Sequence, residues 1–81
     1  MRHAANWRED GDIHIDVRGL PPPGPLLAIL RLIDAGDHVA IVVHHDRDPL
    51  LLYPELAERG WTAQRIPAPD GEVQLRLEPP S

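Results

Sequence analysis

The sequence contains no cysteine, no lysine and no phenylalanine, and its only serine is the last residue, Ser81. Without cysteine the chain cannot form disulfides, iron–sulfur clusters or thiolate metal sites, and it offers no thiol nucleophile. The lack of lysine excludes a Schiff-base amine and a P-loop lysine. Because only Trp7, Tyr53 and Trp61 carry large aromatic rings, the core has to be built from Leu, Ile and Val.

Positive charge is also scarce. Eight arginines stand against 13 acidic residues, which gives a formal net charge of −5 at pH 7. A nucleic-acid binder would show a clustered positive face, so nucleic acid is excluded as an expected partner. No apolar run approaches the ~20 residues that span a bilayer, and the N-terminus has no signal-peptide core. We therefore expect a cytoplasmic protein with no membrane contact.

A single domain is expected over residues 12–79. Residues 1–11 are polar and lack periodicity, so we predict a flexible N-terminal arm there, with Trp7 packed on the domain or held ready for a partner. From Ile13 to Arg18 apolar and polar residues alternate, which predicts a strand. Gly19 ends it, and prolines at 21, 22, 23 and 25 lead into a helix over 25–35, whose apolar face consists of Leu26, Ile29, Leu30 and Ile33.

The second half repeats the strand–helix order and adds two strands. Residues 38–44 are rich in β-branched side chains and predict a central strand. Asp48-Pro49 resembles a helix cap, but Pro54 would interrupt a helix begun there, so we predict a short turn at 50–52 and a helix from 54 to 59. Residues 61–67 and 73–78 predict strands around an Asp70-Gly71 turn. The expected fold is an α/β (α+β) two-layer sandwich, β-α-β-α-β-β, with a mixed four-stranded sheet and two helices on one face.

The junction from 18 to 25, RGLPPPGP, resembles the R-G-L-x-C-P-x-P motif of the TusA/SirA sulfur carriers at Arg18, Gly19, Leu20, Pro23 and Pro25. The position of the sulfur-carrying cysteine is held by Pro22. The chain more closely resembles a cysteine-less relative, domain of unknown function family 2249. That likeness rests on D-V-R-G-L-P-P-P, on H-D-x-x-P-L and on Gly60-Trp61, and it covers residues 13–78. The chain departs from the family at Arg47, where a proline is usual.

The resemblance implies a TusA-like fold, but the chain lacks the cysteine on which the sulfur-transfer chemistry of the TusA/SirA proteins depends. Pro22 has no atom that can hold a persulfide, so sulfur transfer is excluded on this chain. Members of the related family are sometimes fused to hemerythrin-like domains, and the resemblance therefore implies a role beside a redox or metal protein.

Two surfaces are candidate sites. Ligands of open α/β sheets bind beyond the carboxyl ends of parallel strands, where both strand–helix junctions should emerge. The candidate residues for a ligand or partner at this edge are Arg18, Pro22, His44, His45, Asp46 and Arg47. They can equally be structural, with Asp48 as a helix cap and Arg18 paired with a carboxylate. The other surface is the open sheet face, which can be solvated or serve as a homodimer contact; its expected residues are His14, Asp16, Arg18, His38, Ala40, Val42, His44, Gln74 and Arg76.

Metal binding is the alternative function. His14 and His44 should approach each other if their strands are neighbours, and Asp16, His45 or Asp46 could complete a set for Zn, Cu, Ni or Fe. His44 and His45 point to opposite faces if both lie in the strand. The chain offers no cysteine or usable serine nucleophile, and prolines deprive the 19–24 loop of phosphate-binding N–H groups. We therefore expect a non-catalytic module, without a resident cofactor, that binds a protein or small ligand.

Overall fold

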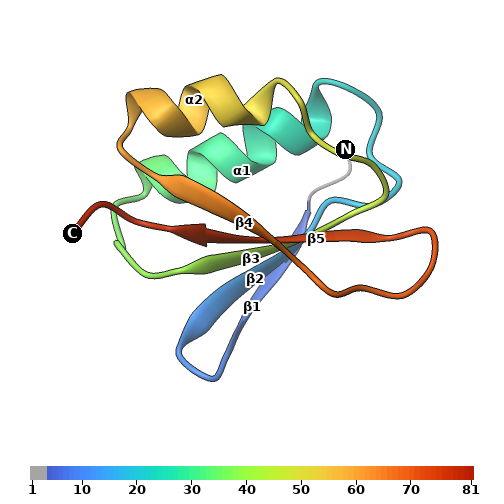
Figure 1. The fold of residues 1–81 in the computed structure, drawn as a ribbon, viewed down its shortest axis with the longest axis horizontal. Helices are drawn as coiled ribbons and strands as arrows, with labels where there is room; N and C mark the ends of the chain where they lie inside the picture. The colour runs from blue at the N-terminus through green and yellow to red at the C-terminus, as the bar shows by residue number, and fades with distance from the viewer. Residues whose placement is uncertain (1–3) are drawn as a thin grey trace.

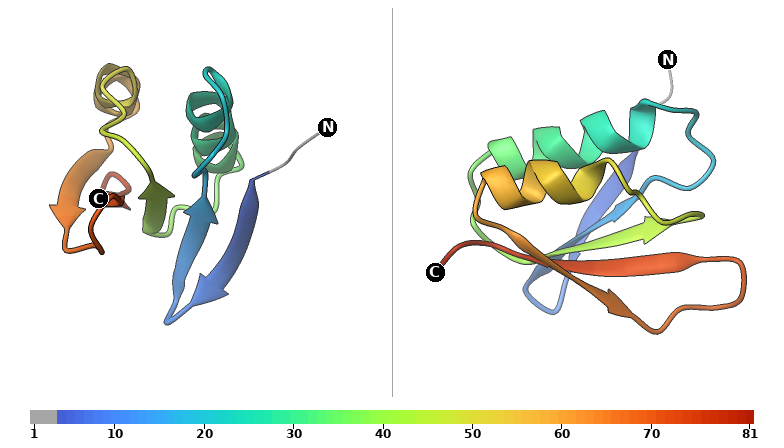
Figure 2. Two further views of the ribbon diagram at one scale, coloured as in Figure 1. Left: turned by 90° about the vertical axis from the view of Figure 1, so that its right-hand side faces the viewer. Right: turned by 45° about the horizontal axis from the view of Figure 1, so that its top comes forward.

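The computed structural model of the chain describes residues 4–81. The elements in chain order are β1 (Ala5–Glu9), β2 (Asp12–Asp16), α1 (Gly24–Asp34), β3 (Ile41–His45), α2 (Leu52–Glu58), β4 (Thr62–Ile66) and β5 (Val73–Glu78). The sheet order is β1-β2-β3-β5-β4, with β2 and β3 parallel and the other pairs antiparallel. Both helices cover one face of the sheet and leave the other open (Figures 1 and 2). The two-layer α+β arrangement is thus confirmed.

The sheet has five strands, so the expectation of four is wrong. The extra strand, β1, lies inside the segment predicted to be an arm, and residues 1–3 of that segment lie outside the described residues. Asp10 and Gly11 both have positive φ, 54° and 84°, and they close a two-residue hairpin onto β2. An Asp-Gly pair suits such a turn because it tolerates left-handed backbone at both positions. Every residue of β1 is exposed, which explains why it shows no hydrophobic alternation.

Two predicted boundaries also move. The strand expected over 38–44 begins at Ile41, because His38 has a φ of 53° and the chain turns there, and it extends to His45. The second helix begins at Leu52 rather than 54. Pro54 is therefore the third helical residue, where an N–H would have no partner within the helix. No described helix is long and apolar enough to cross a membrane.

The core lies between the helices and the sheet and is aliphatic apart from Trp61. It takes Ile13, Ile15 and Val17 from the β2 segment and Ile41 and Val43 from β3, all at most 5% exposed. These positions alternate with residues on the open face, because successive side chains of a strand point to opposite sides. The same alternation sends His45 toward the helices and His44 toward the open face.

Candidate functional site

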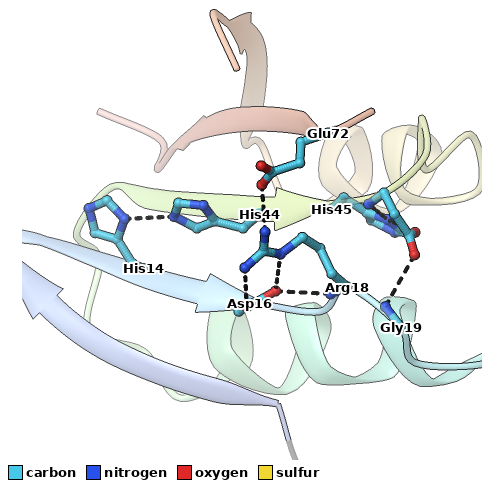
Figure 3. A network of polar contacts seen from close by, with 8 residues as sticks. His14, Asp16, Arg18, Gly19, His44, His45 and Glu72 are labelled. Atoms are coloured by element: carbon cyan, nitrogen blue, oxygen red, sulfur yellow. Dashed lines mark hydrogen bonds and ion pairs between the residues drawn. The ribbon is translucent and has the colours of Figure 1, made fainter. Parts of the chain in front are cut away.

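The two strand–helix junctions meet at the carboxyl edge of β2 and β3. The Val17 N–H donates to the His44 carbonyl over 3.0 Å. The Gly19 N–H donates to Asp46 Oδ2 over 3.1 Å, and Figure 3 shows the dashed line that starts at Gly19. The donation from Gly19 is the main reason that the pKa of Asp46 is lowered. Asp46 therefore ties the loop after β3 to the turn that precedes α1.

His45 is the one buried polar side chain among the described residues, at 2% exposure. Its Nδ1 accepts hydrogen bonds from the backbone N–H groups of Asp46, over 2.9 Å, and Arg47, over 3.2 Å. A nitrogen that accepts two N–H groups carries no proton itself, so the ring proton is on Nε2. The 3.1 Å approach of Nδ1 to Asp46 Oδ1 is then a contact between two acceptors.

A cavity of about 230 Å³ lies between the starts of the two helices and includes His45 in its wall. Apart from His45, Arg47 and Asp48, the wall is apolar and consists of Leu20, Pro22, Pro23, Pro25, Leu26, Pro49, Leu50, Leu51 and Leu52. Nε2 of His45 has no acceptor among the described residues. For comparison, an apolar cavity of ~150 Å³ binds benzene. The space is therefore large enough for a six-membered ring or a branched aliphatic side chain.

The rim of this cavity is apolar and unusually exposed. Leu50 and Leu51, which precede α2, are 71% and 75% exposed. A helix cap was one of the roles considered for Asp48, but the N-terminus of α2 has no side-chain cap, and Asp48 accepts a hydrogen bond from the Tyr53 hydroxyl. Burial, helped by Asp48, raises the pKa of Tyr53 to about 12. The hydrogen bond between Tyr53 and Asp48 therefore holds the loop before α2, while Leu50 and Leu51 remain exposed to solvent.

Arg18 does not line the cavity. Its guanidinium binds Asp16 through Nε and Nη2, over 2.9 and 2.8 Å, and Glu72 through Nη1 over 2.7 Å (Figure 3). The hydrogen bonds from Arg18 are the main cause that lowers the pKa of Asp16 to about 2. Pairing with carboxylates is one of the two roles expected for Arg18, and it links the end of β2 to the turn before β5.

On the open face three rings form a second cluster. Trp7 of β1 stacks on His14 of β2 with ring centroids 5.4 Å apart, and it lies 5.5 Å from the ring of His44. His14 Nδ1 and His44 Nε2 are 3.0 Å apart, close enough to share one proton in a hydrogen bond (Figure 3). Burial, followed by the nearby His14, lowers the pKa of His44.

The proposed metal set is therefore divided between two faces. His14 and His44 approach each other as expected, but His45 lies on the helix side, and its Nδ1 is occupied by the loop backbone. Asp46 bonds to Gly19 at the edge. Within residues 4–81, no group of three or more His, Cys, Asp or Glu side chains could hold a metal ion together. His14, His44, His45 and Asp46 cannot bind one metal ion together, because the alternation along β3 points His44 and His45 to opposite faces of the sheet.

Two features of the two surfaces were missing from the sequence-based sites, and one residue was wrongly placed in them. Trp7 joins the histidine pair through the β1–β2 hairpin, and the Asp10-Gly11 dipeptide was the signal that could have placed it there. Leu50 and Leu51 form the exposed rim, where a run of three leucines after Pro49 gives no clue which of them is buried. His38 was expected on the open face but precedes the strand.

These features define a small two-layer α+β domain with a cavity at the carboxyl edge of its parallel strands. The chain belongs to the family described as "Uncharacterized conserved protein (DUF2249)", whose model matches residues 14–79. The match begins inside β2 and ends after β5, so it covers both junctions and leaves out β1. The comparison with curated proteins found no match.

Proposed function

We propose that this protein is a small non-catalytic binding module that docks a segment of a partner protein at the carboxyl-edge cavity. The observation that carries the proposal is a buried His45 whose Nε2–H has no acceptor in a mostly apolar wall. Nε2 is not among the buried polar atoms that lack a partner, so water reaches it through the cavity in the free protein. A ligand that brings a carbonyl or carboxylate oxygen to Nε2 replaces that water, gains about 0.5–1.5 kcal/mol from the hydrogen bond, and gains specificity as well.

The rim favours a protein segment over a free small molecule. A small-molecule pocket encloses most of its ligand, whereas here Leu50 and Leu51 extend the apolar surface outward beyond the cavity. A central pocket surrounded by apolar contacts is how protein interfaces anchor a single large side chain. The expected ligand is therefore an aliphatic or aromatic side chain whose own backbone carbonyl reaches His45.

Binding fits the residues at this edge better than catalysis does. Nδ1 of His45 is held by two backbone N–H groups, so the ring has only one nitrogen free to act. General acid–base work usually requires a histidine oriented by a third group and placed beside a nucleophile. The cavity wall contains no serine, threonine or cysteine, and its four prolines, at 22, 23, 25 and 49, have no N–H to stabilise an oxyanion.

The test of the cavity uses two probes of matched shape, acetophenone and α-methylstyrene, which differ in a carbonyl oxygen against a methylene group. Amide NMR titration should show shifts confined to the cavity wall, with acetophenone bound roughly two- to tenfold more tightly because of one neutral hydrogen bond. His45→Asn should abolish the preference, since its Oδ1 replaces Nδ1 for the loop but it has no group at Nε2. His44→Asn, the adjacent residue on the other face, is the matched control.

The test of the partner class uses peptides selected from a random linear library on the full-length protein. Peptides that bind the cavity should share a large apolar residue and lose affinity with both His45→Asn and Leu51→Ser. If selected peptides bind these variants as well as the parent, or if neither probe shifts the cavity amides, the proposal is wrong.

A further inference from the structure

The open sheet face carries a pair of histidine side chains whose nitrogens already converge. β2 and β3 are parallel neighbours, and the register pairs His14 with Val42 and Asp16 with His44. The two rings therefore start from diagonal positions and lean toward each other, which brings His14 Nδ1 to 3.0 Å from His44 Nε2 (Figure 3). Two imidazole nitrogens fixed on neighbouring strands are a preorganised donor pair.

We propose that His14 and His44 form a two-nitrogen site for Cu²⁺ or Ni²⁺ on the open face of the sheet. With metal–nitrogen bonds of ~2.05 Å, nitrogens 3.0 Å apart subtend about 94° at the metal. This is the angle between neighbouring ligands in a square-planar or tetragonal complex, the geometry that Cu²⁺ and Ni²⁺ adopt. A tetrahedral Zn²⁺ site would need the nitrogens about 3.3 Å apart. The spacing is compatible with Cu²⁺ and Ni²⁺, nitrogen ligands bind Cu²⁺ more tightly than Zn²⁺ in general, and water fills the remaining positions.

The surroundings hold the pair in place. Trp7 stacks on His14 at 5.4 Å and lies 5.5 Å from His44, so it restrains both rings from one side. Asp16 is bound by Arg18 on both carboxylate oxygens and is not available as a third ligand.

Metal binding requires one proton to move within the pair. In the metal-free protein one of the two facing nitrogens carries the proton of the 3.0 Å hydrogen bond. When both facing nitrogens donate their lone pairs to the metal, that proton is carried instead by the far nitrogen of the same ring. The site is separate from the His45 cavity, and either can be absent without the other.

Trp7 supplies the readout, because a bound Cu²⁺ ion would lie beside its indole ring and quench its fluorescence. All proteins in the titration carry His3→Ala, so that an imidazole near the N-terminus does not compete. Full-length parent protein is titrated with Cu²⁺ and separately with Ni²⁺ and Zn²⁺, and electron paramagnetic resonance of the Cu²⁺ complex counts the coordinated nitrogens. The variants are His14→Asn and His44→Asn, with His38→Ala as the control outside the pair.

The expected result is one Cu²⁺ per chain with two imidazole nitrogens, quenching that is lost in Trp7→Phe, and Zn²⁺ bound more weakly than either Cu²⁺ or Ni²⁺. Each of the two asparagine variants should weaken Cu²⁺ binding roughly tenfold or more, because even residues that only support metal ligands account for factors of that size. A parent protein that binds no more tightly than His14→Asn overturns the proposal. So does a resonance spectrum with a single nitrogen, a measurement on the parent that does not depend on the stability of any variant.

Discussion

His44 and His45 are neighbours in sequence and lie in the same strand, yet they belong to two different surfaces. His45 is buried toward the helices, with Nδ1 fixed by its own loop and Nε2 at the wall of an apolar cavity. His44 faces the open side and meets His14 and Trp7 through ring-to-ring contacts. The first is held by the backbone and the second by other side chains. We expect substitutions on the helix side to cost more stability than those on the open side, which should mainly alter ligand and proton binding.

The largest effect is expected at the floor of the cavity. Leu52 is fully buried, whereas Leu51 beside it is 75% exposed. Leu52→Ala should lower the free energy of unfolding by about 2–5 kcal/mol, because it removes packed methyl groups and enlarges a cavity. Leu51→Ala should change it by less than about 0.5 kcal/mol. Chemical denaturation of both variants measures the difference, and equal losses would show that the rim leucine is packed in solution.

The next effect compares the two histidines directly. His45→Leu leaves the N–H groups of Asp46 and Arg47 without their acceptor, and we expect a loss of about 1–3 kcal/mol in unfolding free energy. His45→Asn should recover part of it, because Oδ1 can accept the same N–H groups. His44→Leu should cost less than His45→Leu in the same denaturation experiment. A larger loss for His44→Leu than for His45→Leu would contradict the contrast between the His45 ring, held by backbone hydrogen bonds, and the His44 ring, held by other side chains.

A smaller effect is expected for Trp7. Its ring packs on two histidine rings while 39% of the residue stays exposed. Trp7→Ala should lower stability by about 0.5–1.5 kcal/mol, the range for aromatic pairs. Trp7→Phe should lose less, and amide shifts should be confined to β1, β2 and β3. Shifts that spread to the cavity wall would mean that the two faces are coupled.

The smallest effect is the pH dependence contributed by His44. Its pKa in the folded protein lies below the usual 6.5, so the unfolded chain binds more protons between the two values. The contribution is therefore fully present above about 6.5 and is lost as the pH falls through the folded pKa. His44→Asn should flatten the slope of stability against pH just below 6.5 in thermal melts. Asp16 acts only at lower pH, because its pKa is lowered from 3.8 to about 2. An unchanged slope in the variant would assign the acid sensitivity elsewhere.

The sequence was sufficient for most of the fold because the buried segments carry strong periodicity. Ile13, Ile15 and Val17 alternate in β2, and Val73, Leu75 and Leu77 alternate in β5, so a single pattern indicates both the strand and its buried face. β1 has no buried residue and therefore no such pattern. Its only signal in the sequence was the Asp10-Gly11 turn. Such a turn predicts a hairpin only when a strand has been recognised on each side of it. The start of α2 was misplaced because a proline interrupts a helix only beyond its first turn. The sequence did not show that the helix begins at Leu52, which puts Pro54 inside that turn.

The candidate site was predictable only as a location. The rule for open sheets placed the 18–24 and 44–48 loops together, and the Gly19–Asp46 hydrogen bond joins them. The rule could not predict that His45 would be buried or that Arg18 would bind Glu72. Both outcomes depend on neighbours that are close in space but far away in sequence. The split of the histidines over two faces did follow from the period of a strand once His45 was included in it.

β1 also changes which strand forms the border of the sheet. Without residues 5–9, β2 would lie at the edge and offer its unpaired backbone, beside the core residues Ile13 and Ile15, to any other extended chain. β1 takes that position with the sequence ANWRE, in which both a positive and a negative charge oppose the addition of a further strand. We therefore expect the β1–β2 hairpin to reduce edge-to-edge self-association of the sheet. A chain that starts at residue 12 should be more prone to aggregate, even if its core folds correctly.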